Sequence, residues 1–205
     1  MATTADFVDT YLRQTAEIAL ATSRDDLARV IDVLFEAYRS DRTIYTCGNG
    51  GSAANASHLA CDIAKFTWAP GKKRFKCSSL CDNAALISAL TNDVGFNRIF
   101  LEQLDGRMVA GDVLVCISVH GGSGADQAGP WSQNLVSAAD FVKKQGGKVV
   151  ALVGYDGGAL RSMADASVIV PRSTAGHTST PHVEGFHEVY HHLICERLLQ
   201  LVTES

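Results

Sequence analysis

Hydrophobic and polar positions follow two rhythms along this chain. Residues 4–22 and 24–39 carry apolar side chains at helical spacing, and Ser23 followed by Asp26 is a plausible helix cap between them. Short apolar runs then alternate with helical stretches. The pattern predicts strands at Thr43–Cys47, Phe75–Leu80, Val113–Ser118, Lys148–Val153 and Ser167–Val170. It predicts helices beginning near Ala53, Asn83, Asn97, Asn134 and Gly158, with a last helix over Val183–Val202.

Unbroken apolar strands that alternate with helices indicate a three-layer α/β fold, in which helices cover both faces of a five-stranded parallel sheet. Such sheets bind ligands at the carboxyl ends of their strands. We expect one domain over residues 1–205, with residues 1–40 as helices outside the sheet. The apolar stripes of these two helices need a partner surface. The stripes contain Leu12, Ile18, Leu27, Val30 and Leu34.

Composition narrows the class of protein. The 205 residues are 46% apolar and 20% charged, with a formal net charge of -4, and residues 71–76 form the only basic cluster, which a solvated loop explains. Nucleic acid and membrane are therefore not expected partners. No run is apolar enough to span a bilayer, and acidic residues interrupt the N-terminal stretch, so we expect a cytoplasmic protein. Six cysteines without CxxC spacing favour buried, reduced thiols.

Two glycine-containing loops follow predicted strands. Gly48–Ser52 (GNGGS) opens a helix, and residues 118–126 (SVHGGSGAD) follow the run DVLVCIS. Glycines let the backbone approach a ligand, and free N–H groups at a helix start favour an anion. Neither loop matches a dinucleotide or Walker pattern, and neither supplies a lysine. The alternatives are tight turns without a ligand and a site that holds a monophosphate through N–H and hydroxyl groups.

Histidines and carboxylates suggest a metal site. His58 and Asp62 lie one turn apart on a predicted helix, a spacing that fits a local hydrogen bond or a metal-ligand pair. The C-terminal stretch holds five of the seven histidines and three glutamates. These are His177, His182, His187, His191 and His192, with Glu184, Glu188 and Glu196. Imidazole with carboxylate suits zinc, with manganese, iron or nickel as alternatives, whereas surface histidines without a metal remain the other interpretation.

In combination, five motifs resemble the phosphoheptose isomerases, which have the sugar-isomerase (SIS) fold. They are GNGGSAANASH (48–58), ALTNDVGFNRIF (89–100), GDVLVCIS…GGS (111–123), KVVALVGYDGGAL (148–160) and VEGFHEVYHHLICE (183–196). The resemblance implies a zinc-dependent enzyme that interconverts aldose and ketose phosphates, typically sedoheptulose 7-phosphate and a heptose 7-phosphate. It also implies a homotetramer with active sites between subunits, in which another subunit covers the N-terminal helices.

The resemblance assigns roles to single residues. His58 matches the first metal ligand, Asp62 stands where the family has a glutamate that is ligand and base, and Glu184 stands where it has glutamine. His192 matches a ligand that is also the second acid–base group. Asp62 and His192 are thus the expected pair for proton transfer through an enediol. The substrate-binding candidates are Asn49, Gly50, Gly51, Ser52, Asp93, Ser118, His120, Ser123 and Thr180.

Several positions depart from the family pattern. Asp62 is one methylene shorter than glutamate, Glu184 adds a charge, and Val119 and His120 replace two hydroxyl residues. The loop after residue 123 is longer than in the family, and Trp131 is either a cover for the site or a packed loop tip. The alternative function is a non-catalytic SIS protein, either a phosphosugar sensor or an adaptor for a replication initiator. Such relatives usually lose the histidine–carboxylate set, so its presence here favours an enzyme.

Overall fold

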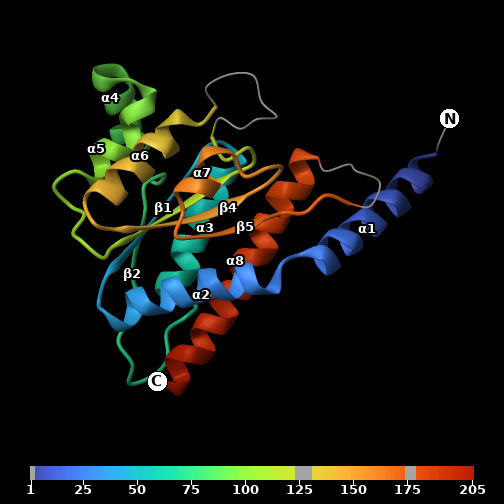
Figure 1. Ribbon diagram of the computed structural model, residues 1–205, viewed down its shortest axis with the longest axis horizontal. Coiled ribbons are helices and arrows are strands. Elements are labelled where there is room, and N and C mark those ends of the chain that lie inside the picture. The colour runs from blue at the N-terminus through green and yellow to red at the C-terminus, as the bar shows by residue number, and fades with distance from the viewer. Residues whose placement is uncertain (1–2, 123–130, 174–178) are drawn as a thin grey trace.

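The computed structural model describes residues 3–122, 131–173 and 179–205 (Figure 1). Its helices are α1 (Thr4–Ala21), α2 (Arg24–Arg39), α3 (Gly51–Lys65), α4 (Ala84–Val94), the 3-10 turn η1 (Phe96–Arg98), α5 (Ile99–Leu104), α6 (Gln133–Lys144), α7 (Gly158–Met163) and α8 (Thr180–Glu204). Its strands are β1 (Thr43–Gly48), β2 (Lys76–Ser79), β3 (Val113–Ser118), β4 (Lys148–Val153) and β5 (Ala166–Ile169). Each predicted strand is present, with ends shifted by at most one residue.

The five strands form one parallel sheet in the order β2-β1-β3-β4-β5, which confirms the predicted fold class. The chain order reverses between β1 and β3, where Gly48 pairs with Ile117. In open parallel sheets, ligands bind at the carboxyl ends of the strands at such a reversal. Both glycine loops leave the sheet there, because one follows β1 and the other follows β3.

Helices cover both faces of the sheet and enclose two hydrophobic cores. One core joins the sheet to α1, α2, α3 and α8, and the other joins it to α5, α6 and α7, with α4 at its margin. Figure 1 shows α4 at the end of its layer, away from α8. All six cysteines are unpaired, as predicted, but only Cys47, Cys116 and Cys195 are buried, while Cys77 and Cys81 are partly buried and Cys61 is exposed. Within the three described ranges, no helix has both the length and the apolar character needed to cross a membrane.

Helix α2 packs within the chain along its apolar stripe, whereas α1 buries only Ile18. The stripe residues Ile18, Leu27, Val30 and Leu34 are buried in the first core, so the expectation that they need a partner subunit is wrong. Strand β5 of the sheet and helix α8 supply the surface on which α2 packs, which the local pattern of α2 does not reveal. Only Leu12 of the predicted stripe is exposed, at 62%.

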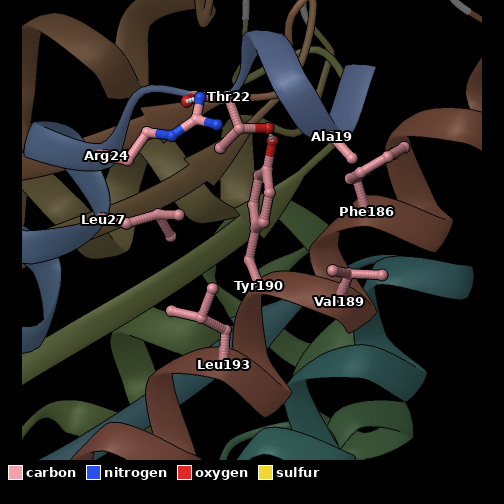
Figure 2. Close-up of a pocket in the computed structure, with 8 residues that line it drawn as sticks. All are labelled: Ala19, Thr22, Arg24, Leu27, Phe186, Val189, Tyr190 and Leu193. Carbon is pink, nitrogen blue, oxygen red and sulfur yellow. Dashed lines mark hydrogen bonds between the residues drawn. The ribbon is translucent and has the colours of Figure 1, made fainter. Parts of the chain in front are cut away.

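A solvent-accessible apolar surface lies where α1 and α2 meet α8. A cavity of about 260 Å³ lies there, lined by Ala19, Thr22, Arg24, Leu27, Phe186, Val189, Tyr190 and Leu193 (Figure 2). Figure 2 shows Tyr190 reaching from α8 to Thr22, and their hydroxyl oxygens are 2.7 Å apart. Helices α1 and α8 also carry exposed apolar side chains. They are Phe7, Val8, Leu12 and Leu20 on α1, with Val189 and Leu193 on α8.

Candidate active site between helices α3 and α8

Helix α3 starts from a turn that only small residues can form. A Cβ atom at Gly48 would lie 2.3 Å from the carbonyl oxygen of Ser52, and Gly50 has a φ of 55°. No side chain in the described part of the chain caps this helix start, so its first N–H groups point out of the turn without an intrahelical acceptor. Ser52 is 3% exposed and carries its hydroxyl in the first turn. The turn thus combines free N–H groups with a buried hydroxyl, which suits an anion.

The second loop packs against the turn after β4. A Cβ atom at Gly121 would lie 2.0 Å from the carbonyl oxygen of Gly157, so the two backbones touch. Within the loop, the Ser118 hydroxyl accepts a hydrogen bond from the N–H of Gly121 at 3.1 Å. This bond shapes the loop and uses one acceptor site of the hydroxyl that we assigned to substrate. The predicted contact Ser123 lies outside the described residues.

His120 lies in an aromatic cluster beside this loop. Its ring stacks on Tyr155 with centroids 4.7 Å apart and an interplanar angle of 8°, and Trp131 lies 5.4 Å away at a tilt. The Nδ1 atom of His120 is buried and has no hydrogen-bond partner among the described residues. Trp131 is 50% exposed, so it borders the loop from the solvent side. The replacement of a family hydroxyl by His120 therefore introduces an aromatic ring at the substrate loop.

The predicted substrate residue Asn49 is held by an amide partner. Its Nδ2 donates to Oδ1 of Asn134 at 2.9 Å, and Nδ2 of Asn134 donates to Oδ1 of Asn49 at 2.7 Å. Asn134 is fully buried in the first turn of α6. The reciprocal pair fixes the glycine turn to the opposite layer of helices. Sequence reasoning missed this role of Asn134, because no local spacing links residues so distant in the chain.

Helices α3 and α8 run side by side in the same direction. Gly51 faces Glu184, His58 faces Glu188, and Asp62 faces His191 and His192. Residue numbers increase together along both helices, so both N-termini open at the carboxyl edge of the sheet. One seam therefore joins the glycine turn to the histidine–carboxylate residues.

Four side chains of the seam form a potential metal site. Donor atoms of His58, Asp62, His191 and His192 all lie within 4.8 Å of one another. Asp62 Oδ2 is at their centre, 3.6 Å from His58 Nε2, 3.3 Å from His191 Nε2 and 3.6 Å from His192 Nε2. A tetrahedral ion with bonds of about 2.0–2.1 Å separates its ligand atoms by about 3.3 Å. The three distances to Asp62 are close to this separation, and three imidazoles with one carboxylate form a donor set that suits a divalent metal ion.

Glu188 orients this group from the side. Its Oε1 lies 2.5 Å from His58 Nδ1, while Nε2 of the same ring faces Asp62. A carboxylate on the other ring nitrogen is the usual support for a metal-binding histidine, because it fixes the tautomer. Burial lowers the pKa of His191, with Glu188 opposing the change, so His191 is held as a neutral imidazole with a lone pair available to a metal.

Three further predicted site residues, one of them a predicted metal ligand, also lie outside this group. Glu184 is on α8, but its carboxylate lies against Gly51 at the start of α3 rather than beside Asp62. Thr180 is exposed in the first turn of α8. Asp93 is exposed near the end of α4, in the helix layer on the other face of the sheet, where Asn92 donates to it at 2.8 Å. The structure thus brings three of the four predicted metal ligands together: His58, Asp62 and His192.

Sequence reasoning did not select His191 or Glu188, although both lay in the histidine-rich stretch it singled out. Helical spacing would have indicated them, because Glu188 and His192 are i, i+4 and His191 is i+3 from Glu188. That spacing fits several subsets of the stretch equally well. The packing of α8 on α3 selects one of them.

Comparison with known proteins identifies the family to which this fold belongs. The family model described as SIS domain matches residues 7–154, which include α3 but not α8. Lincomycin biosynthesis protein LmbN of Streptomyces lincolnensis is 40% identical over 183 residues, covering 89% of this chain and 64% of that protein. This chain thus spans less than two thirds of the length of LmbN.

Phosphoheptose isomerases match over more of their length. One from Nitratiruptor sp. is 32% identical over 174 residues, covering 84% of this chain and 82% of that protein. The structure of phosphoheptose isomerase GmhA from Neisseria gonorrhoeae superposes with a TM-score of 0.79 at 26% identity, covering 95% of each chain. The chain therefore belongs to the SIS-domain family and, within it, to the phosphoheptose isomerases, a family of phosphosugar isomerase enzymes.

Proposed function

We propose that this protein is a metal-dependent aldose–ketose isomerase of a sugar phosphate, with sedoheptulose 7-phosphate and heptose 7-phosphate as the expected pair. One observation carries the proposal: the group of His58, Asp62, His191 and His192 lies on the same helix seam as the glycine turn at Gly48–Ser52. The similarity to phosphoheptose isomerases supports the substrate class.

The phosphate of the substrate is bound at the carboxyl edge of the sheet. N–H groups of Gly51 and Ser52 and the hydroxyl of Ser52 are its partners on the first loop, and Ser118 and His120 border it on the second. At a rise of about 1.5 Å per residue, His58 lies about 9 Å beyond Ser52 along α3. That length is comparable to an extended six- or seven-carbon sugar phosphate. One helix thus contacts both ends of the substrate.

His58, Asp62 and His192 hold the metal, and His191 is the fourth donor within the chain. When bound, a divalent ion such as zinc polarises the carbonyl or hydroxyl oxygens of the sugar. Asp62 removes the proton from the carbon α to the carbonyl and returns it to the former carbonyl carbon, while His192 transfers a proton from the neighbouring hydroxyl oxygen to the carbonyl oxygen. Asp62 is suited to this step because its side chain is only 18% exposed and faces three imidazoles. Glu188 keeps the His58 ring in the orientation that this arrangement needs.

The protein assembles as a homotetramer, with the active sites between subunits. The apolar side chains left open on α1 and α8 support an association, and they include Leu12 at 62% and Val189 at 52% exposure. Large patches of exposed apolar side chains are typical of protein–protein interaction sites. Light scattering at micromolar concentration measures the mass, and a monomer would exclude the assembly.

A combined metal and turnover assay tests the function. Purified protein is analysed for bound transition metals and then incubated with a panel of sugar phosphates, while aldose and ketose are separated by chromatography. We expect about one equivalent of metal per chain and reversible conversion of a seven-carbon substrate that a chelator abolishes. Sugar-phosphate binding without turnover would instead favour the non-catalytic, phosphosugar-binding SIS protein.

A further inference from the structure

Glu184 places a carboxylate at the start of helix α3. A Cβ atom built on Gly51 would lie 2.4 Å from Oε1 and 2.8 Å from Oε2 of Glu184, so both oxygens sit directly over this glycine. Asn55 holds the two helices in this arrangement, because its Nδ2 donates to the carbonyl oxygen of Glu184 at 3.0 Å. The absence of a side chain at Gly51 is what allows the carboxylate to approach.

This carboxylate lacks a counter-charge. Across residues 3–122, 131–173 and 179–205, no ion pair and no hydrogen bond to its oxygens is found. Neighbouring helix N-termini are the favourable electrostatic partners left to it, through their partial positive charge. Glu184 is only partly buried, so its oxygens are open to hydrogen-bond donors from water or from a bound ligand.

The carboxylate also lies beside the proposed path of the substrate. Gly51, Asn55, His58 and Asp62 recur every three or four residues and therefore share one face of α3, the face that contacts α8. Glu184 covers the first of these positions, next to Ser52 and before His58. A sugar phosphate that extends from the glycine turn to the metal group passes this side chain.

We propose that Glu184 makes the site select an extended sugar phosphate over free phosphate; this rests on the proposed function and adds a residue that determines specificity. An ionised carboxylate only accepts hydrogen bonds, so the hydroxyls of a sugar chain satisfy it. A phosphate group at the same helix start is repelled by it. Free phosphate meets the repulsion alone, whereas the hydroxyls of a sugar phosphate compensate for it. Glutamine at this position would remove the repulsion.

Titration calorimetry with two probes, inorganic phosphate and sedoheptulose 7-phosphate, tests this assignment. The proteins are the wild type, Glu184→Gln and the control Glu196→Gln, which removes the same charge from an exposed position on the same helix. We expect Glu184→Gln to bind phosphate about tenfold more tightly and to lose about tenfold of the preference for the sugar phosphate. Glu196→Gln should keep the wild-type preference. Glu184→Ala is a second variant and should also bind phosphate more tightly.

The outcomes separate this role from the proposed function. If the wild type isomerises the sugar phosphate but Glu184→Gln and Glu184→Ala keep its preference between the probes, the role of Glu184 is overturned and the isomerase stands. An equal loss of preference in Glu196→Gln also overturns it, because general charge would then explain the effect. If the wild type binds neither probe, both proposals fall. Metal content should stay at the wild-type level in Glu184→Gln, since the carboxylate lies outside the metal group.

Discussion

Helix α8 carries histidines in two contrasting settings. His191 and His192 face α3, where Asp62 lies within 3.6 Å of both rings. His182 and His187 face the interior without a carboxylate contact among the described residues: His182 stacks on Tyr11 with centroids 4.0 Å apart, and neither ring nitrogen of His187 makes a hydrogen bond. The same residue type on one helix therefore belongs to the candidate metal site on one side and is a packing ring on the other.

The difference arises from the neighbours rather than from burial. His191 and His187 are both fully buried, and burial lowers the pKa of each, to about 4 for His187. Of the two, only His191 lies close to carboxylates. Its Nε2 is 3.3 Å from Asp62 Oδ2, and its Nδ1 is 3.4 Å from Glu188 Oε2. A carboxylate balances the positive charge of a metal ion, whereas the apolar surroundings of His187 exclude any charge. Removing each histidine should therefore have different consequences.

The largest effect is expected from His58→Ala, which removes a donor and the partner of Glu188. Bound metal and turnover should both fall below detection, as measured by elemental analysis and an isomerase assay. The control is His187→Leu, which removes an imidazole that lies away from the carboxylates. This variant should keep the full metal content. If both variants lose metal equally, the two settings are not functionally distinct.

Asp62→Asn should have the next largest effect on the reaction. Asparagine nearly keeps the size and one oxygen donor but cannot accept the substrate proton. We expect partial metal occupancy and a loss of at least about 100-fold in turnover, the scale of a missing general base. Glu196→Gln removes a carboxylate from an exposed position on α8 and is the control. A wild-type rate in Asp62→Asn would show that another group is the base.

His187 should make the folded state sensitive to acid. Its folded pKa of about 4 lies below the unfolded value of 6.5, so the unfolded chain binds the extra proton between these values. Stability is then present above pH 6.5 and is lost as the pH falls toward 4. At pH 5 this group alone destabilises the fold by about 2 kcal/mol.

Denaturant unfolding of the wild type and His187→Leu at pH 7 and pH 5 measures this contribution. Other groups titrate in both proteins, so the difference between the two pH dependences isolates His187. The variant should lose about 2 kcal/mol less than the wild type over this range. Parallel curves for the two proteins would show that His187 is protonated in the fold without penalty.

The smallest effect is expected from Tyr190→Phe, on the side of α8 that faces α1 and α2. The hydroxyl of Tyr190 lies 2.7 Å from that of Thr22, which also donates to the carbonyl oxygen of Ile18 at 2.9 Å. Loss of one buried hydrogen bond destabilises a protein by about 1 kcal/mol. Thermal unfolding should show a lower midpoint, with unchanged metal content and turnover. A change in turnover would link this face to the active site.

Much of the fold was predictable from local patterns. The strands Val113–Ser118 and Lys148–Val153 agree residue for residue with their apolar runs, and helix α2 has its predicted bounds. Strands of a parallel sheet are buried on both faces. They therefore appear in the sequence as short continuous apolar runs rather than as alternating apolar and polar residues. The glycine turn was also predictable, since the strand before it and the helix after it leave room only for a tight connection. His58 and Asp62 followed from spacing on one helix.

Tertiary structure decided which distant residues meet. The stripe of α2 could have packed on another subunit, but the sheet and α8 bury Leu27, Val30 and Leu34 within the chain instead. Contact between two helices depends on their relative direction and on the rotation of each about its axis. The hydrophobic pattern of either helix alone specifies neither. For the same reason, the parallel packing of α3 on α8 brought His191 into the metal group and left Glu184 beside Gly51. The sequence determined the elements and the type of chemistry, and the packing of two helices determined which side chains can perform it.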